Sequence, residues 1–415
     1  MTVDHHGQSL KDLAIIALHG YIDRIFPITN PKTLMNRVFS SVQLEESSTV
    51  SALRDSLQAA IDQGAKGLLL LIGSANEIDL KQLPSLLREL SIPAVGVVVP
   101  GVLLQDQVYE DGIAVCGLTS TSAATVVPNI NRSEHELNHD IQQILNMNPN
   151  PSGVLIVIDG LSRGVDNFVT TLHDCIGPDV QVIGAGCGYR DFSIQPNVIT
   201  ADGLLLNAAL LLFTTLELVT SVSHGWEPVE GPFLITDALD NQIQQINYQP
   251  AFPFYLNILS QHLGRTVAVE EFAALANHYP FGMAQLDSEF LVRDPVNRVR
   301  NAIVFAGAVP TNAMVYLLHA SPHELVQAAG SAVANLRDRF SSRYGQETGL
   351  NVFLIDCISR RMVLGEHYGD ELAIIRQCLP NNVSVLGILS IGEIANSHQG
   401  GIQWLNKTTV IGGLA

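Results

Sequence analysis

The feature that most limits how this chain can fold is a layout that occurs three times, in residues 68–98, 154–184 and 352–387. Each time, a short apolar run is followed by a polar loop, an amphipathic helix and a second apolar run that carries or adjoins a glycine. Continuous apolar runs bounded by loops are typical of parallel strands covered on both faces. Each stretch is therefore predicted to be a βαβ unit, and the chain an α/β protein with repeated βαβ units in mixed sheets and two domains.

The second and third units also share letters directly after their first strand. Residues 159–163 read DGLSR and residues 356–360 read DCISR, so Asp, Ser and Arg recur at the same offsets. This recurrence suggests a duplication. Because loops at the carboxyl ends of parallel strands are where α/β sheets build binding sites, both loops are predicted to contribute to function.

Composition excludes several classes of function. The 22 Lys and Arg residues stand against 40 Asp and Glu residues, a net charge of −18. Such a surface repels phosphate backbones and anionic lipids, so we expect no nucleic-acid partner. Residues 204–222 are almost wholly apolar, but they contain Asn207 and Glu217 and lack a basic flank. They are predicted to be a buried core element rather than a membrane span.

The remaining patterns concern compartment and organisation. The five cysteines form no C-x-x-C pair and the N-terminus lacks a signal-peptide pattern, which favours a reducing cytoplasm. Pro250 and Pro253 interrupt the pattern near a domain junction. We therefore predict an N-terminal segment over 1–45, a first domain over 46–248 and a second over 249–411. Two capping boxes, at 133–136 and 321–324, predict helix starts.

Short motifs in a fixed order identify a family resemblance. The first group is Asp159-Gly160, Val182-Ile-Gly184, His224-Gly225-Trp226-Glu227-Pro228 and Pro250-Ala251. The second is Tyr279-Pro-Phe-Gly282, Val292-Arg293-Asp294-Pro295, Ala306-Gly-Ala-Val-Pro310, Asp356-Cys357-Ile-Ser-Arg360, Leu364-Gly365, Gly387, Gly392-Glu393-Ile394 and Asn406-Lys-Thr408-Thr409. The groups resemble the N and C domains of the FIST family (F-box and intracellular signal transduction proteins). The loop after Gly96 departs from the family's pattern.

The resemblance implies a cytoplasmic sensory protein rather than an enzyme. It would bind a small ligand and signal in trans to a partner signalling protein, such as a histidine kinase or a cyclic-nucleotide enzyme. No cofactor is predicted. Some FIST proteins resemble haem-carrying nitric-oxide sensors, which leaves haem possible, with His224 as the candidate iron ligand.

The predicted ligand site gathers polar groups at strand ends. An Arg would grip a carboxylate while an Asp accepts from an ammonium group, so an amino acid would suit the site. In the alternative reading, each Asp caps a turn and each Arg lies at the surface. Gly392 would allow close backbone approach and Glu393 would offer an acceptor, or both belong to a solvated turn. The predicted ligand-binding residues are Asp159, Arg163, Arg293, Asp356, Cys357, Arg360, Gly392 and Glu393.

Two nucleophiles define an enzymatic alternative. Ser162 lies in a Gly-x-Ser-x-Gly motif between a predicted strand and helix, and Cys357 lies in the echoing loop. The loop with Cys357 lacks both glycines of the motif, which favours a non-nucleophilic role shared by the two loops. The glycines of residues 184–188 lack the Lys of a phosphate loop, so they indicate tight packing or ligand approach.

Overall fold

The computed structural model describes residues 38–120, 122–148, 150–285, 289–344, 351–397 and 401–414. Most of the N-terminal segment predicted for residues 1–45 lies outside the described residues. Its last part is strand β1 (Phe39–Glu45).

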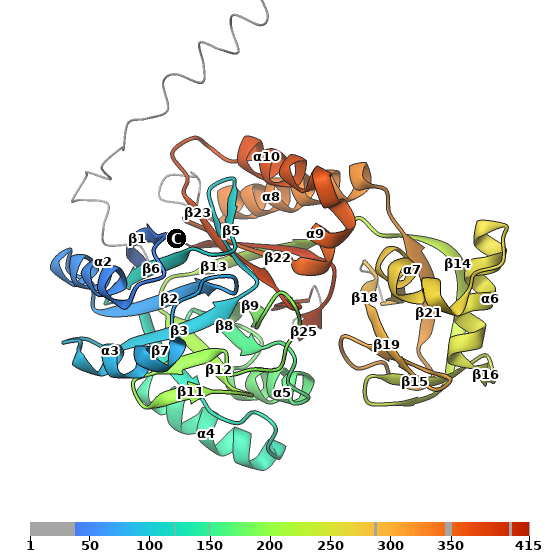
Figure 1. Ribbon diagram of the computed structural model, residues 1–415, viewed down its shortest axis with the longest axis horizontal. Helices are drawn as coiled ribbons and strands as arrows, with labels where there is room; N and C mark the ends of the chain where they lie inside the picture. Colours follow the sequence, from blue (N-terminus) through green and yellow to red (C-terminus); the bar gives the residue numbers. More distant parts are fainter. Residues whose placement is uncertain are drawn as a thin grey trace, which may run out of the picture. The chain divides into compact units, whose positions relative to one another are not determined.

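All three predicted βαβ units are present, and the two strands of each pair in parallel (Figure 1). Their strands are almost wholly buried, which is why both faces are apolar. The third unit has two helices instead of the single one expected, because Gly365, with a φ of +53°, ends the first of them. The units consist of β2 (Gly67–Gly73), η2 (Leu80–Gln82), α3 (Leu83–Glu89) and β3 (Ala94–Val99); β8 (Gly153–Asp159), α5 (Val165–Ile176) and β9 (Gln181–Cys187); and β22 (Asn351–Cys357), α9 (Ile358–Leu364), η4 (Gly365–His367), α10 (Tyr368–Cys378) and β23 (Val385–Ser390).

Each βαβ unit is the centre of a longer repeat. A strand and a helix precede the unit, and a later antiparallel strand pairs with both the leading strand and the unit's first strand. Ile72, Ile158 and Asp356 each face the first residue of that antiparallel strand, so the three registers are equivalent. The chain thus contains three copies of one fold. The added elements are β1, α2 (Val50–Asp62) and β6 (Ile113–Leu118); β7 (Ser122–Val127), α4 (Glu134–Met147) and β12 (Ala209–Thr214); and β13 (Leu218–Ser223), α8 (Pro322–Tyr344) and β26 (Thr409–Leu414).

A hairpin between the βαβ unit and the antiparallel strand joins the sheet of another repeat. The first repeat's hairpin extends the third sheet beside β23, the second's extends the first sheet beside β3, and the third's extends the second sheet beside β9. Because this exchange is cyclic, none of the three sheets is complete without a neighbouring repeat. The hairpin strands are β4 (Gly101–Leu104), β5 (Gln107–Tyr109), β10 (Val198–Thr200), β11 (Gly203–Leu205), β24 (Glu393–Asn396) and β25 (Ile402–Leu405).

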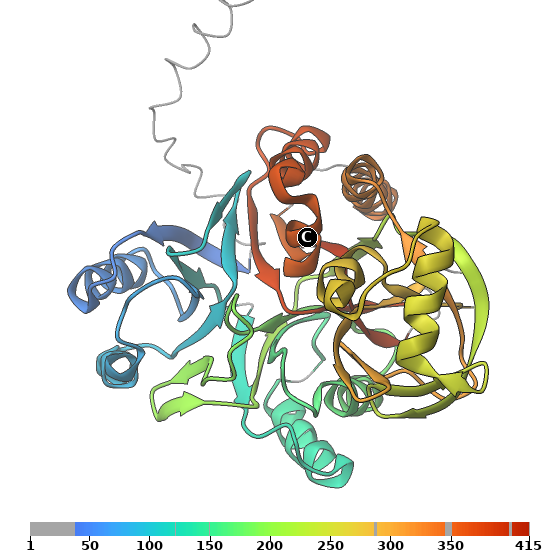
Figure 2. The ribbon, with the colours of Figure 1, turned by 45° about the vertical axis from the view of Figure 1, so that its right-hand side comes forward.

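The inner faces of the three sheets share one core, and the outer faces carry the helices. Along β2, Leu69 and Leu71 pack in the shared core together with residues of β8, β9, β22 and β23. Leu68 and Leu70 pack instead with α2 and α3, because successive side chains of a strand point to opposite faces. Figure 2 shows α2 and α3 on the same side of the first repeat's strands.

An insertion between β13 and α8 of the third repeat forms a small barrel. Strands β18 and β19 follow one another in the chain but lie at the two ends of the sheet order, β18 on β17 and β19 on β20. Residues 291–299 therefore close the sheet on itself. The predicted boundary between residues 248 and 249 falls inside this insertion. Its elements are β14 (Glu227–Leu239), β15 (Gln242–Ile246), β16 (Gln249–Pro250), α6 (Ala251–Leu263), η3 (Val269–Glu271), α7 (Phe272–His278), β17 (Phe281–Met283), β18 (Leu291–Arg293), β19 (Pro295–Val299), β20 (Ala302–Phe305) and β21 (Met314–His319).

Two further local predictions are confirmed. The apolar stretch 204–222 forms the buried strand β12 and most of β13. Among the described residues, no helix is long and apolar enough to cross a membrane. Both capping boxes form: Ser133 with Glu136 at the start of α4, and Ser321 with Glu324 at the start of α8.

The glycines of residues 184–188 serve close packing between the second and third repeats. A Cβ on Gly186 would lie 2.1 Å from the Ile391 carbonyl oxygen and 2.8 Å from the Trp404 ring. A Cβ on Gly392 would lie 2.2 Å from the same ring. The missing side chains make room for this indole, which belongs to the hairpin that the third repeat donates.

Gly186→Ala is expected to lower the free energy of unfolding by about 1–3 kcal/mol, because the new methyl group overpacks a contact made by rigid backbone. Chemical denaturation measures this loss. Gly369→Ala is the matched control: Gly369 lies in α10, and a Cβ there would meet nothing within 4 Å. A helical Gly→Ala change of this kind stabilises by about 0.5–1 kcal/mol. Equal effects of the two substitutions would contradict the packing role.

Candidate functional site

The shared letters of the two loops do not mark equivalent positions. Asp159 pairs with the last residue of β9 and Cys357 with the last residue of β23, so these two residues occupy the same place. Asp356 is instead equivalent to Ile158, one residue earlier. A shift of one residue turns a side chain to the other face of the sheet. The two aspartates therefore point to opposite faces, Asp159 to the inner and Asp356 to the outer.

Arg360 lies at the centre of an outer cluster, which we define as Asp356, Arg360, Tyr368, Glu371 and Thr409. Arg360 and Glu371 form a fully buried bidentate ion pair, with N–O distances of 3.1 and 2.8 Å. Asp356 lies 3.4 Å from Arg360 Nε and accepts hydrogen bonds from Tyr368 and Thr409. Burial and the charge of Glu371 raise the pKa of Asp356 well above its ordinary value. Two carboxyl groups thus share one guanidinium group.

The guanidinium group of Arg360 has no donor left for a ligand. Its remaining N–H groups donate to the backbone oxygens of Leu325, His224 and Lys407 at 3.0, 2.7 and 3.3 Å. Burial alone would lower the pKa of Arg360, but the charges of Glu371 and Asp356 raise it above its ordinary value. Arg360 therefore ties α9 to α10, to the start of α8 and to the turns before β14 and β26.

Glu393 is the centre of an inner cluster, which we define as Cys357, Ser390, Glu393 and Thr408. One carboxylate oxygen of Glu393 accepts from Ser390 at 2.6 Å, and the other from the Thr408 hydroxyl and amide at 2.7 and 3.1 Å. The Cys357 thiol also donates to this carboxylate. Desolvation raises the pKa of Glu393 to about 7, although these hydrogen bonds lower it. Glu393 belongs to β24 in the second sheet and so joins that sheet to the third.

The other two repeats show what these positions hold when no polar cluster forms. Val102 and Val198 occupy the place of Glu393, and Ile72 and Ile158 that of Asp356. Burying charge is costly, and the same backbone accepts apolar residues twice. Among the described residues, every buried charged side chain except Asp159 belongs to the third repeat or its insertion. The polar interior of that repeat is therefore not required by the fold.

A buried ion pair connects these clusters to the barrel. Lys407 Nζ lies 3.2 Å from the Asp294 carboxylate and donates to both oxygens of Asn277. Ser359 donates to Asp294 at 2.8 Å. Burial raises the pKa of Asp294, while Lys407 lowers it. The indole of Trp226 donates to the Lys407 carbonyl oxygen.

The predicted site residues separate into two groups. Asp356, Cys357, Arg360 and Glu393 lie in the two clusters. Arg163 is exposed on the second repeat. Asp159 accepts from the amides of Asn207 and Leu161 and so caps a turn, as the alternative reading expects. Gly392 packs on Trp404, and Arg293 lies in the barrel wall.

Sequence reasoning missed four charged or amide residues of the third repeat and its insertion: Asp294, Glu371, Asn406 and Lys407. Three of them occur in motifs that indicated the family resemblance, but no function was predicted for them. Glu371 lies in the first turn of α10, where an acidic residue is common on an exposed surface. Its only signal would have been a comparison of three aligned repeats.

The surroundings of the two candidate nucleophiles differ from those of an activated group. Ser162 donates to the Asn131 side-chain oxygen at 2.8 Å rather than to a basic group. Burial, and next the charge of Glu393, raise the pKa of the Cys357 thiol. A thiolate is therefore disfavoured at that position.

His224 does not fit the role of a haem ligand. Its Nδ1 accepts a hydrogen bond from the Trp226 amide at 2.9 Å, so the proton of the neutral ring lies on Nε2. Burial, and next the charge of Arg360, lower the pKa of His224 to about 4, which keeps the ring neutral at pH 7. With Nε2 protonated and 3.4 Å from a Glu289 carboxylate oxygen, the ring offers no lone pair to iron. In the described ranges, no three His, Cys, Asp or Glu side chains form a metal-binding group.

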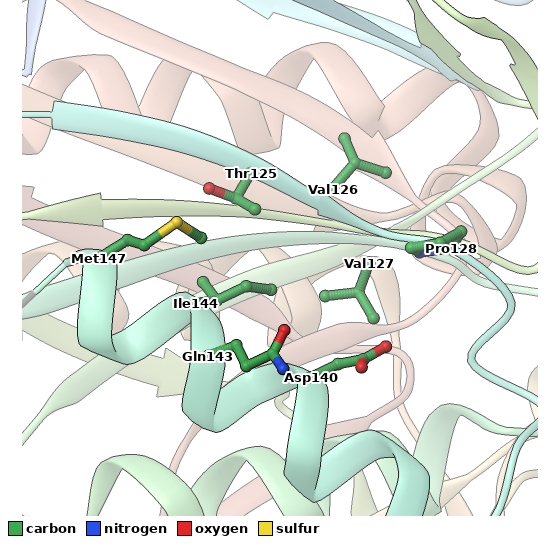
Figure 3. A pocket seen from close by; sticks show the side chains of 8 residues that line it. All are labelled: Thr125, Val126, Val127, Pro128, Asp140, Gln143, Ile144 and Met147. Carbon is green, nitrogen blue, oxygen red and sulfur yellow. The ribbon is translucent and has the colours of Figure 1, made fainter.

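A shallow surface pocket of about 250 Å³ lies between β7 and α4 (Figure 3). It contains none of the predicted site residues. Met147 and Ile144 of α4 face Thr125 and Val127 of β7 across it. β7 is an edge strand of its sheet, so the pocket is separate from the polar clusters in both position and chemistry.

Comparisons with known proteins identify the family of the chain. A comparison with curated proteins found no match. Two family models do match: the FIST N domain over residues 67–249 and the FIST C domain over residues 251–396. The second match begins inside the inserted barrel and ends in the hairpin that the third repeat donates. Together the matches cover most of the chain, which therefore belongs to the FIST family, whose domains are associated with signal transduction and sensing.

Proposed function

We propose that this protein is a non-catalytic cytoplasmic sensor that binds a small, amino-acid-like ligand where the third repeat meets its inserted barrel. It would signal in trans to a partner such as a histidine kinase or a cyclic-nucleotide enzyme. The family's association with sensing supports the general role. The single observation that carries the proposal is that, within the described part of the chain, buried charge other than Asp159 is confined to one of three equivalent repeats and its insertion.

The hydrogen bonds suggest how binding would be transmitted. Asp294 of the barrel holds Ser359 of α9 and Lys407 of the turn before β26. The Lys407 carbonyl oxygen in turn accepts from Arg360, which holds Glu371 of α10. A ligand that binds one arrangement of this network more tightly than another increases the population of the arrangement that it prefers.

Thermal-shift screening against the twenty L-amino acids and related metabolites tests the proposal. A ligand present at 100 times its dissociation constant should add about 2.7 kcal/mol to the free energy of unfolding. Hydrogen exchange should then slow in the barrel and also in α9 and α10, because the network joins them. Arg163→Ala, at an exposed position, should leave both effects unchanged.

Three results would argue against the sensor. They are the absence of a binder in a broad set, protection confined to the barrel, and turnover or covalent labelling at Ser162 or Cys357. A Soret band in protein expressed with adequate iron, lost in His224→Ala, would support the haem alternative instead.

A further inference from the structure

Arg293 is a buried cation whose hydrogen bonds are incomplete. Its side chain is 4% exposed. Nε donates to the Ala308 carbonyl oxygen at 2.9 Å, and Nη1 donates to those of Trp404 and Val292 at 3.0 and 3.3 Å. Within the described residues, Nη2 donates to no acceptor. Three of the five N–H groups of the guanidinium are therefore used, and the two on Nη2 are available.

The charge of Arg293 also lacks a carboxylate in direct contact among the described residues. Its acceptors are all backbone oxygens. Burial lowers the pKa of Arg293 to about 10, and the charge of Asp166 offsets only part of this effect. Asp166 itself accepts from the Ala308 amide. The side chain thus remains cationic at pH 7 in a place where a bound anion would stabilise it.

Asn406 supplies the opposite kind of unpartnered group. Its side chain is 2% exposed, and its Oδ1 has no hydrogen-bond partner. Its Nδ2 donates to the Leu405 carbonyl oxygen at 2.9 Å, which fixes the orientation of the amide because that oxygen can only accept. Asn406 follows Trp404, the Arg293 acceptor, by two residues. The second repeat has Leu206 at the equivalent position. The strand registers make Thr408 equivalent to Ala208, and the residues before them, Lys407 and Asn207, both adopt a positive φ.

A residue without a side chain lies against the guanidinium group. Gly307 has a φ of +126°, and a Cβ there would lie 3.2 Å from Arg293 Cζ and 3.0 Å from Trp404 Cδ1. The loop over residues 306–308 can therefore lie against Arg293 without covering it by a side chain. The barrel, the donated hairpin and the first turn of α5 meet here through hydrogen bonds of Arg293 and Ala308.

We propose that Arg293 and Asn406 are the recognition pair of the sensor, with Arg293 Nη2 binding the carboxylate of an α-amino acid and Asn406 Oδ1 accepting from its ammonium group. The inference rests on the proposed function and names its binding residues and ligand class. A water molecule at Nη2 would satisfy the hydrogen bonds but would leave the cation without a counter-ion. A zwitterion supplies both the anion and the missing donor.

Isothermal titration of the full chain with the amino acids that stabilise it tests the pair. Arg293→Met and Asn406→Leu should each weaken binding by about 10–100-fold, the effect of losing a hydrogen bond to a charged group. Asn406→Leu introduces the residue that the second repeat already has there, so the fold should be retained. Arg298→Met, at an exposed arginine five residues further along, is the matched control and should bind as the wild type does.

The possible outcomes distinguish failure of the proposed recognition pair from failure of the proposed sensor function. Binding that is unchanged in both variants would place the ligand elsewhere and overturn the pair while the sensor stands. If no amino acid binds the wild type, the proposed ligand class is wrong, and acetate is used to probe whether Arg293 binds a carboxylate. In spectra of ¹⁵N-arginine-labelled protein, acetate should then shift the Nε–Hε signal that Arg293→Met removes. A signal that neither acetate nor any amino acid shifts would overturn the recognition pair.

Discussion

Arg360→Met is expected to lower the free energy of unfolding by about 3–5 kcal/mol, because it removes one partner of a buried ion pair and leaves the other uncompensated. Glu371 and Asp356 would remain fully buried without the cation they share. Three backbone oxygens would each lose one donor in the same step, although that of Lys407 keeps the Trp226 indole. Chemical denaturation at pH 7 measures the loss.

The neighbouring arginine provides a matched control. Arg361 pairs with Glu110 at the surface, with 30% of its side chain exposed. Surface ion pairs contribute about 0–1 kcal/mol, so Arg361→Met should cost no more than that. Similar losses at the two positions would mean that burial of the Arg360 network has no energetic consequence.

A triple variant distinguishes a lost charge balance from lost packing. Asp356→Ile, Arg360→Met and Glu371→Met together remove all three buried charges, and the isoleucine is the residue of the other two repeats. Such replacements are often neutral or stabilising. We expect the triple variant to regain at least half of the loss, though not all of it, because the three backbone oxygens still lack the donors that Arg360 supplied. A triple variant less stable than Arg360→Met would contradict this explanation.

The βαβ units could be predicted because a strand buried on both faces must be apolar throughout. The exchange of hairpins could not be predicted. Strands β4, β10 and β24 pair with strands of another repeat, and such pairing produces no periodic pattern in the sequence. The closure of the barrel by residues 291–299 is equally invisible, since one continuous extended segment changes partners at Asp294.

Part of the candidate site could be predicted for the same local reasons. Asp356 and Glu393 lie at strand ends, where polar residues suggest a site, and Arg360 lies in α9 directly after β22. The matching letters wrongly aligned Asp159 with Asp356. Asp159 is the last residue of β8, whereas Asp356 is the last but one of β22, and the sequence pattern does not reveal this difference of one residue. Lys407 is missed because nothing in its neighbours distinguishes a buried lysine from an exposed one.

Glu393 is expected to make stability fall as pH rises through neutrality. Its folded pKa of about 7 lies above the ordinary glutamate value of 4.5, so the folded state holds the proton more tightly than the unfolded state. The contribution is fully present below pH 4.5 and is lost as pH rises through 7. A shift of this size corresponds to about 3 kcal/mol at 1.36 kcal/mol per pH unit.

Glu393→Gln tests this expectation because glutamine imitates the protonated carboxyl group. Its oxygen can accept from Thr408, and its amide can donate to the Ser390 hydroxyl, which is within 3.2 Å of the Asp356 carbonyl oxygen and can donate there. The free energy of unfolding, measured from pH 5 to 8.5, should fall less in the variant than in the wild type. The difference between the two curves isolates Glu393 from the other titrating groups. A difference that stays constant across this range would show that Glu393 is already ionised at pH 5, and that the hydrogen bonds from Ser390, Thr408 and Cys357 outweigh its desolvation.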